Sequence, residues 1–165
     1  MFMRKLITLA GLALAVVAIS PASAPAKAGG TDRPVKGTIS GTVSLNVLTG
    51  AFTADGTGVA THLGKYTVSL QGAVAITPEG VFGSGTGTIV AANGDQMTGT
   101  ITLETPGQPG VAHTTTIVVT VTGGTGRFSD ASGTLTAITE VSPISFDGVT
   151  LVNSVEDTAT GQISY

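Results

Sequence analysis

Hydrophobic and polar residues alternate along most of the chain beyond residue 37. Between residues 38 and 47, Ile39, Val43 and Leu45 fall on one face, while threonine, serine and asparagine fall on the other. A period of two is typical of a β-strand with one buried face. The same pattern predicts strands over 97–104 and 116–122, with weaker runs over 58–63, 66–76, 81–91, 135–141, 149–155 and 161–165. No helical period follows the first 24 residues, so we expect an all-β domain.

The residues between these runs are typical of turns. Asn93-Gly94 separates two predicted strands, and this dipeptide is the preferred centre of a two-residue hairpin turn. We therefore predict an antiparallel hairpin at this point. Two prolines and two glycines within residues 105–110 predict a longer loop, because such residues do not continue a hydrogen-bonded ladder.

A glycine-rich stretch, TGGTGRFSDASG, occupies residues 122–133 and follows one of the clearest strands. We expect Gly123, Gly124 and Gly126 to adopt positive φ angles or closely packed positions, with the ring of Phe128 behind the turn. The stretch lacks the third glycine of a dinucleotide-binding fingerprint and precedes a strand rather than a helix. Nucleotide binding is therefore not expected.

Glycine also recurs inside the predicted strands. A Gly-Thr-Ile or similar tripeptide begins at residues 37, 87, 99, 133 and 161. Glycine weakens a strand unless the sheet must bend, and repeated bends are what a closing barrel requires. About eight strands are compatible with a sandwich or a barrel, and the glycines favour a closed antiparallel barrel. We expect its edges, 37–41 and 161–165, to pair with each other.

The first residues predict export. Arg4 and Lys5 precede an apolar run from Leu6 to Ile19, and Ala22-Ser23-Ala24 forms a small-residue cleavage site. This is the pattern of a secretory signal peptide over residues 1–24. The apolar run is shorter than a membrane-spanning helix requires, so an uncleaved anchor is the weaker interpretation. We expect a periplasmic or extracellular protein.

The rest of the chain divides into two parts. Cleavage after residue 24, or at a second small-residue site after residue 28, leaves a polar segment, 25–36, that predicts a flexible linker. The barrel domain is predicted over residues 37–165, which is long enough to bury one sizeable core. The chain contains no cysteine, so this exported domain must be held by its core and its hydrogen bonds.

The charge distribution excludes some partners. Seven Lys and Arg residues stand against ten Asp and Glu residues, and beyond residue 36 the only cations are Lys65 and Arg127. No basic stripe is available to neutralise phosphates, so we expect neither nucleic acid nor, after signal cleavage, a membrane as a partner. The pattern indicates no particular oligomeric state.

Few side chains are candidates for site chemistry. His62 lies in a strand-like run and is a candidate pocket contact or general base, although a structural histidine is the simpler interpretation. Arg127 is a candidate for binding an anionic head group, or for closing the turn with a local ion pair near Asp130. Ile101 and Val119 lie on the apolar faces of their strands and are candidate ligand contacts. With two histidines and no cysteine, we expect neither a metal nor a cofactor, and we assign no catalytic residue.

Carboxylates are expected at turns and on the solvated face. Asp95 follows Asn93-Gly94, where its side chain would satisfy backbone N–H groups. Glu104, Glu140 and Glu156 alternate with the apolar positions and so fall on the solvated faces of their strands. The sequence therefore predicts no pair of catalytic carboxylates.

Residues 121–128, VTGGTGRF, followed by Ala131 and Gly133, resemble the Gly-Gly-Thr/Ser-Gly-x-Phe pattern shared by plant allene oxide cyclases and dirigent proteins. Residues 60–64 and 91–95 resemble secreted bacterial proteins with the same barrel. The resemblance covers about residues 36–165, and it implies an eight-stranded barrel whose apolar lumen binds hydrophobic small molecules. The glycine pattern is a structural signature of that superfamily, so catalytic activity and site residues are not carried over.

Two hypotheses for function follow. In the first, the protein binds a hydrophobic small molecule in the lumen, or binds it and also steers its isomerisation, because the inward positions are small and only 4% of residues are aromatic. In the second, it is a surface or structural interaction protein that uses threonine-rich outer faces such as 98–102, 114–116 and 120–122. A twisted barrel does not present a flat array of hydroxyls, which favours the first hypothesis.

Overall fold

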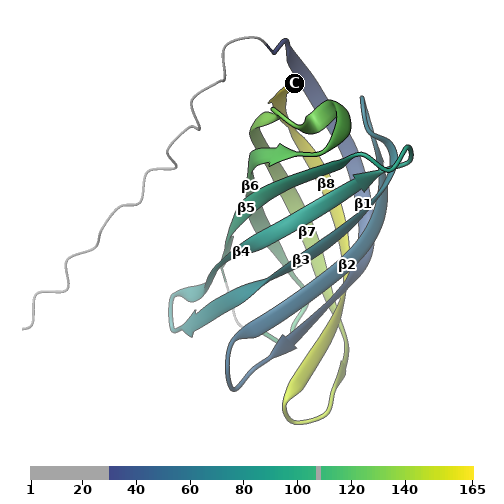
Figure 1. Ribbon diagram of the computed structural model, residues 1–165. Helices are drawn as coiled ribbons and strands as arrows, with labels where there is room; N and C mark the ends of the chain where they lie inside the picture. The colour runs from purple at the N-terminus through teal and green to yellow at the C-terminus, as the bar shows by residue number, and fades with distance from the viewer. Residues whose placement is uncertain (1–29, 107–108) are drawn as a thin grey trace, which may run out of the picture.

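The computed structural model describes residues 30–106 and 109–165, which form one antiparallel β-barrel (Figure 1). Within these residues its strands are β1 (Asp32–Asn46), β2 (Ala51–Ala60), β3 (Gly64–Thr77), β4 (Gly80–Ala91), β5 (Gln96–Thr105), β6 (His113–Gly124), β7 (Ser132–Phe146) and β8 (Thr150–Ser164). A turn of 3-10 helix, η1 (Gly126–Phe128), connects β6 to β7. Each strand pairs with its sequence neighbours, and β8 pairs with β1. The predicted closed barrel of eight antiparallel strands is confirmed.

The barrel closes along the pair formed by β1 and β8, which begins with Asp32 opposite Ser164. The first and last strands pair, as predicted, but the predicted segments 37–41 and 161–165 do not lie opposite each other, because Gly37 lies opposite Ala159 and Gly161 lies opposite Val35. The strand therefore includes residues 32–36, which the sequence indicated as the end of a flexible linker. Pro34 is tolerated there because β1 pairs with β2 only from Gly37 onward, so its missing N–H lies on an unpaired edge. The predicted signal peptide and residues 25–29 lie outside the described residues.

The described strands all extend beyond the predicted runs at one end or both, and two of the predictions differ in more than their ends. The runs predicted over 149–155 and 161–165 are parts of the continuous strand β8, whose middle carries Glu156-Asp157-Thr158 and so interrupts the apolar pattern. The run predicted over 58–63 is the end of β2, which begins at Ala51. In both places pairing with the neighbouring strands continues through polar or small residues that weaken the alternation.

Side chains alternate between lumen and solvent as predicted for the clearest strands. Met97 and Ile101 of β5 and Val121 of β6 are buried, whereas Thr100 and Thr122 are exposed. The recurrent glycines at positions 37, 87 and 99 line the lumen. A Cβ atom at these positions would overlap Ala60 Cβ, Leu70 Cδ2 and the Thr120 carbonyl oxygen respectively, so glycine allows the wall to pack closely here.

The β4–β5 hairpin predicted at Asn93-Gly94 is present, but its turn is one residue longer than predicted. The N–H of Gly94 donates to the carbonyl of Ala91 at 2.9 Å, and the N–H of Ala91 donates to the carbonyl of Asp95 at 2.9 Å. The loop therefore comprises residues 92–94, and Gly94 has a φ of 88°. A type I turn followed by a left-handed glycine is the usual three-residue hairpin, which explains why Asn-Gly also suits this loop. The loop predicted over 105–110 falls within the β5–β6 connection, of which residues 107–108 are not described.

One end of the barrel is closed by side chains and is called the capped end. It is formed by residues 61–63, 92–95 and 125–131 (Figure 1). Phe128 and Ile163 are completely buried there and belong to the main hydrophobic core of the described residues. The ring of Phe128 meets that of Tyr165 edge-on, with centroids 4.9 Å apart. The capped end therefore holds the two large side chains of the core that are completely buried.

Two arginines cover this pair of rings. The guanidinium of Arg127 lies 4.7 Å from the centroid of the Phe128 ring, and that of Arg33 lies 4.8 Å from the centroid of the Tyr165 ring. Such cation–π contacts contribute about 0.5–1 kcal/mol at exposed sites. The four side chains form a stack that joins β1, the last residues of the chain and the η1 turn.

The glycines of residues 123–126 adopt the two kinds of position that were predicted. Gly123 and Gly126 have φ angles of 146° and 57°. Gly124 does not have a positive φ, but a Cβ atom at this position would overlap the carbonyl oxygen of Gln96 on β5. The turn therefore needs glycine for conformation at two positions and for close approach at a third.

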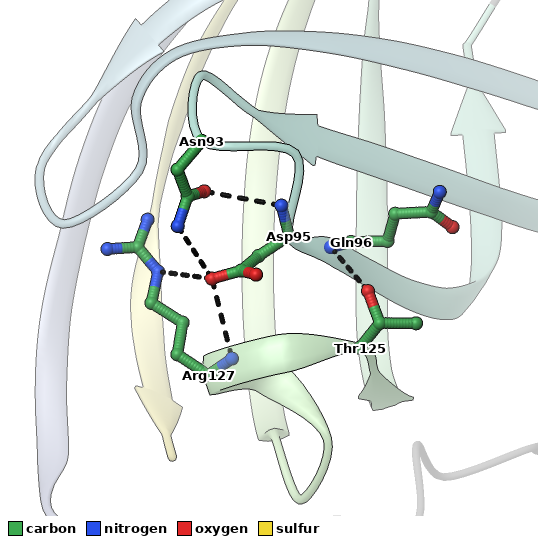
Figure 2. A network of polar contacts seen from close by, with 5 residues as sticks. All are labelled: Asn93, Asp95, Gln96, Thr125 and Arg127. Carbon is green, nitrogen blue, oxygen red and sulfur yellow. Dashed lines mark hydrogen bonds and ion pairs between the residues drawn. The ribbon is translucent and has the colours of Figure 1, made fainter.

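Asp95 holds the two turns of the capped end together (Figure 2). Its carboxylate accepts hydrogen bonds from the side-chain amide of Asn93 at 2.7 Å and from the N–H of Arg127 at 3.4 Å. The Nε of Arg127 lies 3.6 Å from the same oxygen. The Thr125 hydroxyl adds a further bridge, because it accepts a hydrogen bond from the N–H of Gln96 at 3.0 Å. The expected role of Asp95 in its turn thus extends to the η1 segment.

The opposite end, called the rim end, is formed by residues 47–50, 78–79, 147–149 and the described part of 106–112. Among the described residues, most exposed large hydrophobic side chains lie here, all but Val59 and Ile138: Leu48, Ile76, Phe82, Val111, Ile144, Phe146 and Val149. Phe146 is 58% exposed, in contrast to the buried Phe128. In the described part of the chain, no helix has the length and apolar character needed to span a membrane.

Candidate functional site

The lumen contains two adjoining cavities that are lined mainly by apolar side chains. The cap-side cavity has a volume of ≈ 80 Å³ and the rim-side cavity has a volume of ≈ 130 Å³. Residues that line both cavities are Ala54, Leu70, Ile117, Val155 and Asp157. The cavities therefore meet at the level of Asp157, which is the charged member of this shared set.

The cap-side cavity is bordered by Tyr66 of β3 and by lumenal glycines. The Tyr66 hydroxyl donates a hydrogen bond to the carbonyl of Thr38 at 3.3 Å. Burial and the negative charge of Asp157 together raise the pKa of Tyr66 to about 12. The phenol is therefore neutral at physiological pH and keeps this cavity uncharged on the β3 side.

The rim-side cavity has more polar groups in its wall. Thr105 and Thr115 are buried, and their hydroxyl oxygens lie 2.7 Å apart, so one hydroxyl donates a hydrogen bond to the other. His113 lines the cavity near the rim end, and its Nδ1 lies 2.7 Å from the carbonyl oxygen of Val111. Asn153 and Thr139 are also buried in this wall. A ligand in this cavity would therefore meet an apolar surface with a few polar contacts, which is the usual design of a small-molecule site.

Asp157 faces the lumen from β8, between Ile39 of β1 and Thr139 of β7 in the strand register. Burial raises the pKa of its carboxyl above the ordinary value, and the negative charge of Glu156 adds to this rise. The nearby Thr139 hydroxyl opposes the shift, although the two side chains do not meet hydrogen-bond geometry. Oδ1 of Asp157 and Oγ1 of Thr139 are buried without a hydrogen-bond partner among the described residues.

The structure places the four candidate ligand contacts in different surroundings. Ile101 lines the rim-side cavity and Val119 lines the cap-side cavity. His62 is not in a strand: it is exposed in the β2–β3 turn with a φ of 66° and lines neither cavity. Histidine tolerates this left-handed conformation better than bulky residues do, which explains its place in a turn. Arg127 lies on the outside of the capped end and pairs with Asp95.

The most informative lumenal residue, Asp157, was missed by sequence reasoning. A signal was present, because Leu151, Asn153, Val155, Asp157 and Ala159 occupy alternate positions of one strand. Ending the predicted strand at residue 155 removed Asp157 from that face. By contrast, Glu104, Glu140 and Glu156 are exposed, as predicted.

The outer wall carries the threonines that the alternation placed there. Thr100 is exposed and is the register partner of Thr86 on β4 and of Thr120 on β6.

Nowhere in residues 30–106 and 109–165 do three or more His, Asp or Glu side chains come together to hold a metal ion. Comparisons with protein family models, with curated proteins and with solved structures found no match.

Proposed function

We propose that this protein binds a small hydrophobic molecule in the lumen of its barrel. The observation that supports this most directly is the pair of adjoining cavities inside a closed wall. An apolar cavity offers water few hydrogen-bond partners, so an apolar molecule of suitable size gains free energy by entering it. The proposal assigns binding and no chemical reaction.

The volumes restrict the size of the ligand. An apolar cavity of about 150 Å³ accommodates benzene, whereas pockets for drug-sized ligands have volumes of about 300–1,000 Å³. The rim-side cavity of ≈ 130 Å³ is therefore on the scale of one six-membered ring. The cap-side cavity of ≈ 80 Å³ adds space for a short substituent.

We further propose that binding takes place outside the cytoplasm, after removal of residues 1–24 or 1–28. The apolar run and the small-residue cleavage sites of the sequence support export. The resemblance of residues 121–128 to plant allene oxide cyclases and dirigent proteins supports a lumenal ligand, since those proteins bind hydrophobic small molecules in such a barrel.

Titration with toluene, followed by amide chemical shifts in NMR spectra, tests this proposal. Saturable binding is expected, with the largest shifts on strands that line the cavities. Ile101→Phe and Val119→Phe each place a ring in one cavity, so we expect the affinity for toluene to fall at least tenfold in one or both variants. The chain contains no tryptophan, and substitution by phenylalanine keeps it so. The fluorescence of indole, added as a second ligand, therefore gives an independent measurement of binding.

Two control variants separate filling of the lumen from general damage. Val118→Phe places the same ring on the outward side of β6, and His62→Ala changes an exposed turn. Both are expected to bind toluene like the wild type. The proposal is wrong if the wild type shows no saturable binding and both lumenal Phe variants lose about 1–3 kcal/mol of stability, because side chains then already fill the lumen.

A further inference from the structure

Two buried oxygen atoms at the meeting point of the cavities lack the hydrogen bonds that such atoms normally have. Oδ1 of Asp157 and Oγ1 of Thr139 have no hydrogen-bond partner among the described residues. Residues 139 and 157 are partners in the register of β7 and β8, and both line the rim-side cavity. Thr139 is only 2% exposed. Buried polar atoms are nearly always satisfied, so these two require a specific explanation.

We propose that Asp157 and Thr139 form a polar anchor that selects lumenal ligands carrying a hydrogen-bond donor on a small apolar body. This inference rests on the proposed function and narrows its ligand class to small amphipathic alcohols, phenols and amines. A donor from the ligand satisfies the carboxylate, while the apolar body occupies the cavity on either side of Asp157. Thr139 contributes a hydroxyl that accepts from the ligand or donates to its heteroatom.

The charges around the anchor support a donor rather than an acceptor on the ligand. Apart from His113, whose Nδ1 is held by the Val111 carbonyl, no basic side chain lines either cavity in the described residues. Tyr66 lines the cap-side cavity, but its hydroxyl donates to the Thr38 carbonyl. Glu156, next to the anchor in sequence, adds negative charge from the outer face. An anionic ligand would be repelled here, whereas a hydroxyl or an ammonium group would be attracted.

A structural role for Asp157 makes a different prediction. If the carboxylate only stabilised the fold, its replacement would lower the melting temperature. A buried carboxylate without a partner instead destabilises the fold, so replacement by an apolar residue is expected to raise the melting temperature. Loss of donor binding together with increased stability is the signature of a group retained for function.

Three ligands of nearly equal shape test the anchor: ethylbenzene, benzyl alcohol and benzylamine. They carry a methyl group, a neutral donor and a cationic donor at the same position. We expect Asp157→Leu to weaken the two donor ligands by about tenfold or more and to leave ethylbenzene equally or more tightly bound. Thr139→Val removes one oxygen at constant shape and is expected to act in the same direction with a smaller factor. Glu156→Leu, on the outward face of the same strand, is the matched control and should change none of the three affinities.

The outcomes separate the two proposals. If Asp157→Leu and Thr139→Val change all three affinities by the same factor or not at all, the anchor is wrong and lumenal binding stands. If the wild type binds none of the three, lumenal binding itself fails. If Asp157→Leu lowers the melting temperature and Thr139→Val binds the donor ligands like the wild type, Asp157 is structural and the anchor is again wrong. A preference for benzylamine that disappears as Asp157 is protonated at low pH identifies a cationic ligand, and a preference for benzyl alcohol identifies a neutral one.

Discussion

The two ends of this barrel differ in where their large apolar side chains lie. At the capped end, the η1 turn inserts Phe128 into the core and the stack with Tyr165 closes the lumen. At the rim end, the described turns leave Phe146 and other large apolar side chains exposed, and the larger cavity extends toward them. The same residue type thus fills space at one end and faces solvent at the other.

This difference separates the apolar core from the polar part of the lumen within one small domain. The core cluster of the described residues, which includes Met97, Phe128 and Ile163, is drawn from the capped end. The buried residues that line the rim-side cavity include Thr115, Thr139 and Asn153, which contribute polar groups to its wall. A barrel with a packed plug at one end can leave space near the other and still fold.

The sharpest test of the comparison replaces one phenylalanine at each end. Phe128→Ala removes a fully buried ring and is expected to lower the free energy of unfolding by about 3–5 kcal/mol. Phe146→Ala removes a ring that is 58% exposed and should change it by no more than about 0.5 kcal/mol. Urea denaturation followed by circular dichroism measures both. Equal losses would show that the two ends contribute alike to the core.

The glycines of the two ends offer a second contrast. Gly124→Val places a branched side chain against the Gln96 carbonyl, so we expect a loss of about 1–3 kcal/mol. Gly148 of the rim end has a φ of 99°, and a Cβ atom there would meet no other atom within 4 Å. Gly148→Ala should therefore cost about 1–2 kcal/mol from backbone conformation alone. Thermal denaturation compares the two. A Gly124→Val protein as stable as wild type would refute the close approach of the capped-end turn to β5.

Asp95 connects two turns at the capped end, whereas Asp147 makes hydrogen bonds inside one turn at the rim end. Asp95→Ala breaks the contacts to Asn93 and Arg127 and is expected to cost about 1 kcal/mol, since the ion pair is partly exposed and screened. Asp147 accepts hydrogen bonds from the N–H groups of Val149 and Thr150, which belong to its own turn. Hydrogen exchange should therefore quicken in both 92–95 and 125–131 after Asp95→Ala, but only around 147–150 after Asp147→Ala. Faster exchange confined to 92–95 after Asp95→Ala would show that the two capped-end turns are independent.

The smallest expected effects are on the pH dependence of stability, which a residue of each end changes at an opposite extreme of pH. Burial and the charge of Asp157 raise the pKa of Tyr66 to about 12, so its contribution to stability is complete below pH 10 and is lost between pH 10 and 12. Backbone hydrogen bonds from Thr150 and Val149 lower the pKa of Asp147, so its contribution is complete above pH 3.8 and is lost as the pH falls through the lowered value. Stability profiles of Tyr66→Phe and Asp147→Asn measure these effects. Ionisation of Tyr66 near pH 10 in the folded protein would contradict its burial.

The alternation of residues was sufficient to predict the strands, because a period of two is set by the pleat of the strand itself. The glycines within the strands then favoured a barrel over a sandwich. Ile101 and Val119 were placed on the lumenal face for this reason, and both line a cavity. The length of the β4–β5 loop was not determined, since Asn-Gly is suited to both two-residue and three-residue turns. Residues 32–36 entered β1 because of pairing with β8, which is a long-range contact that local composition does not encode.

The candidate site was harder to predict for a related reason. His62 attracted attention as a rare side chain, but its position depended on where β2 ends, and β2 ends at Ala60. Asp157 was overlooked because the predicted strand ended at residue 155, whereas β8 continues to Ser164 and carries the alternation through residue 157. The pairing of Arg127 with Asp95 was not predicted either, since Asp95 is distant in sequence and comes near only when the two turns of the capped end meet.

The closing pair of strands has a consequence for the order in which this chain is made and folded. Asp32 near one end of the chain is the register partner of Ser164 near the other, so β1 keeps an unpaired edge until β8 has been synthesised. The rings of Phe128 and Tyr165 meet only at the same late stage. A nascent chain that stops before β8 therefore lacks both the closing β1–β8 pair and the contact between the two rings. It exposes two unpaired sheet edges to other protein chains. Closure of the barrel is therefore the last pairing open to the growing chain, whereas the other seven pairings join strands that are adjacent in sequence.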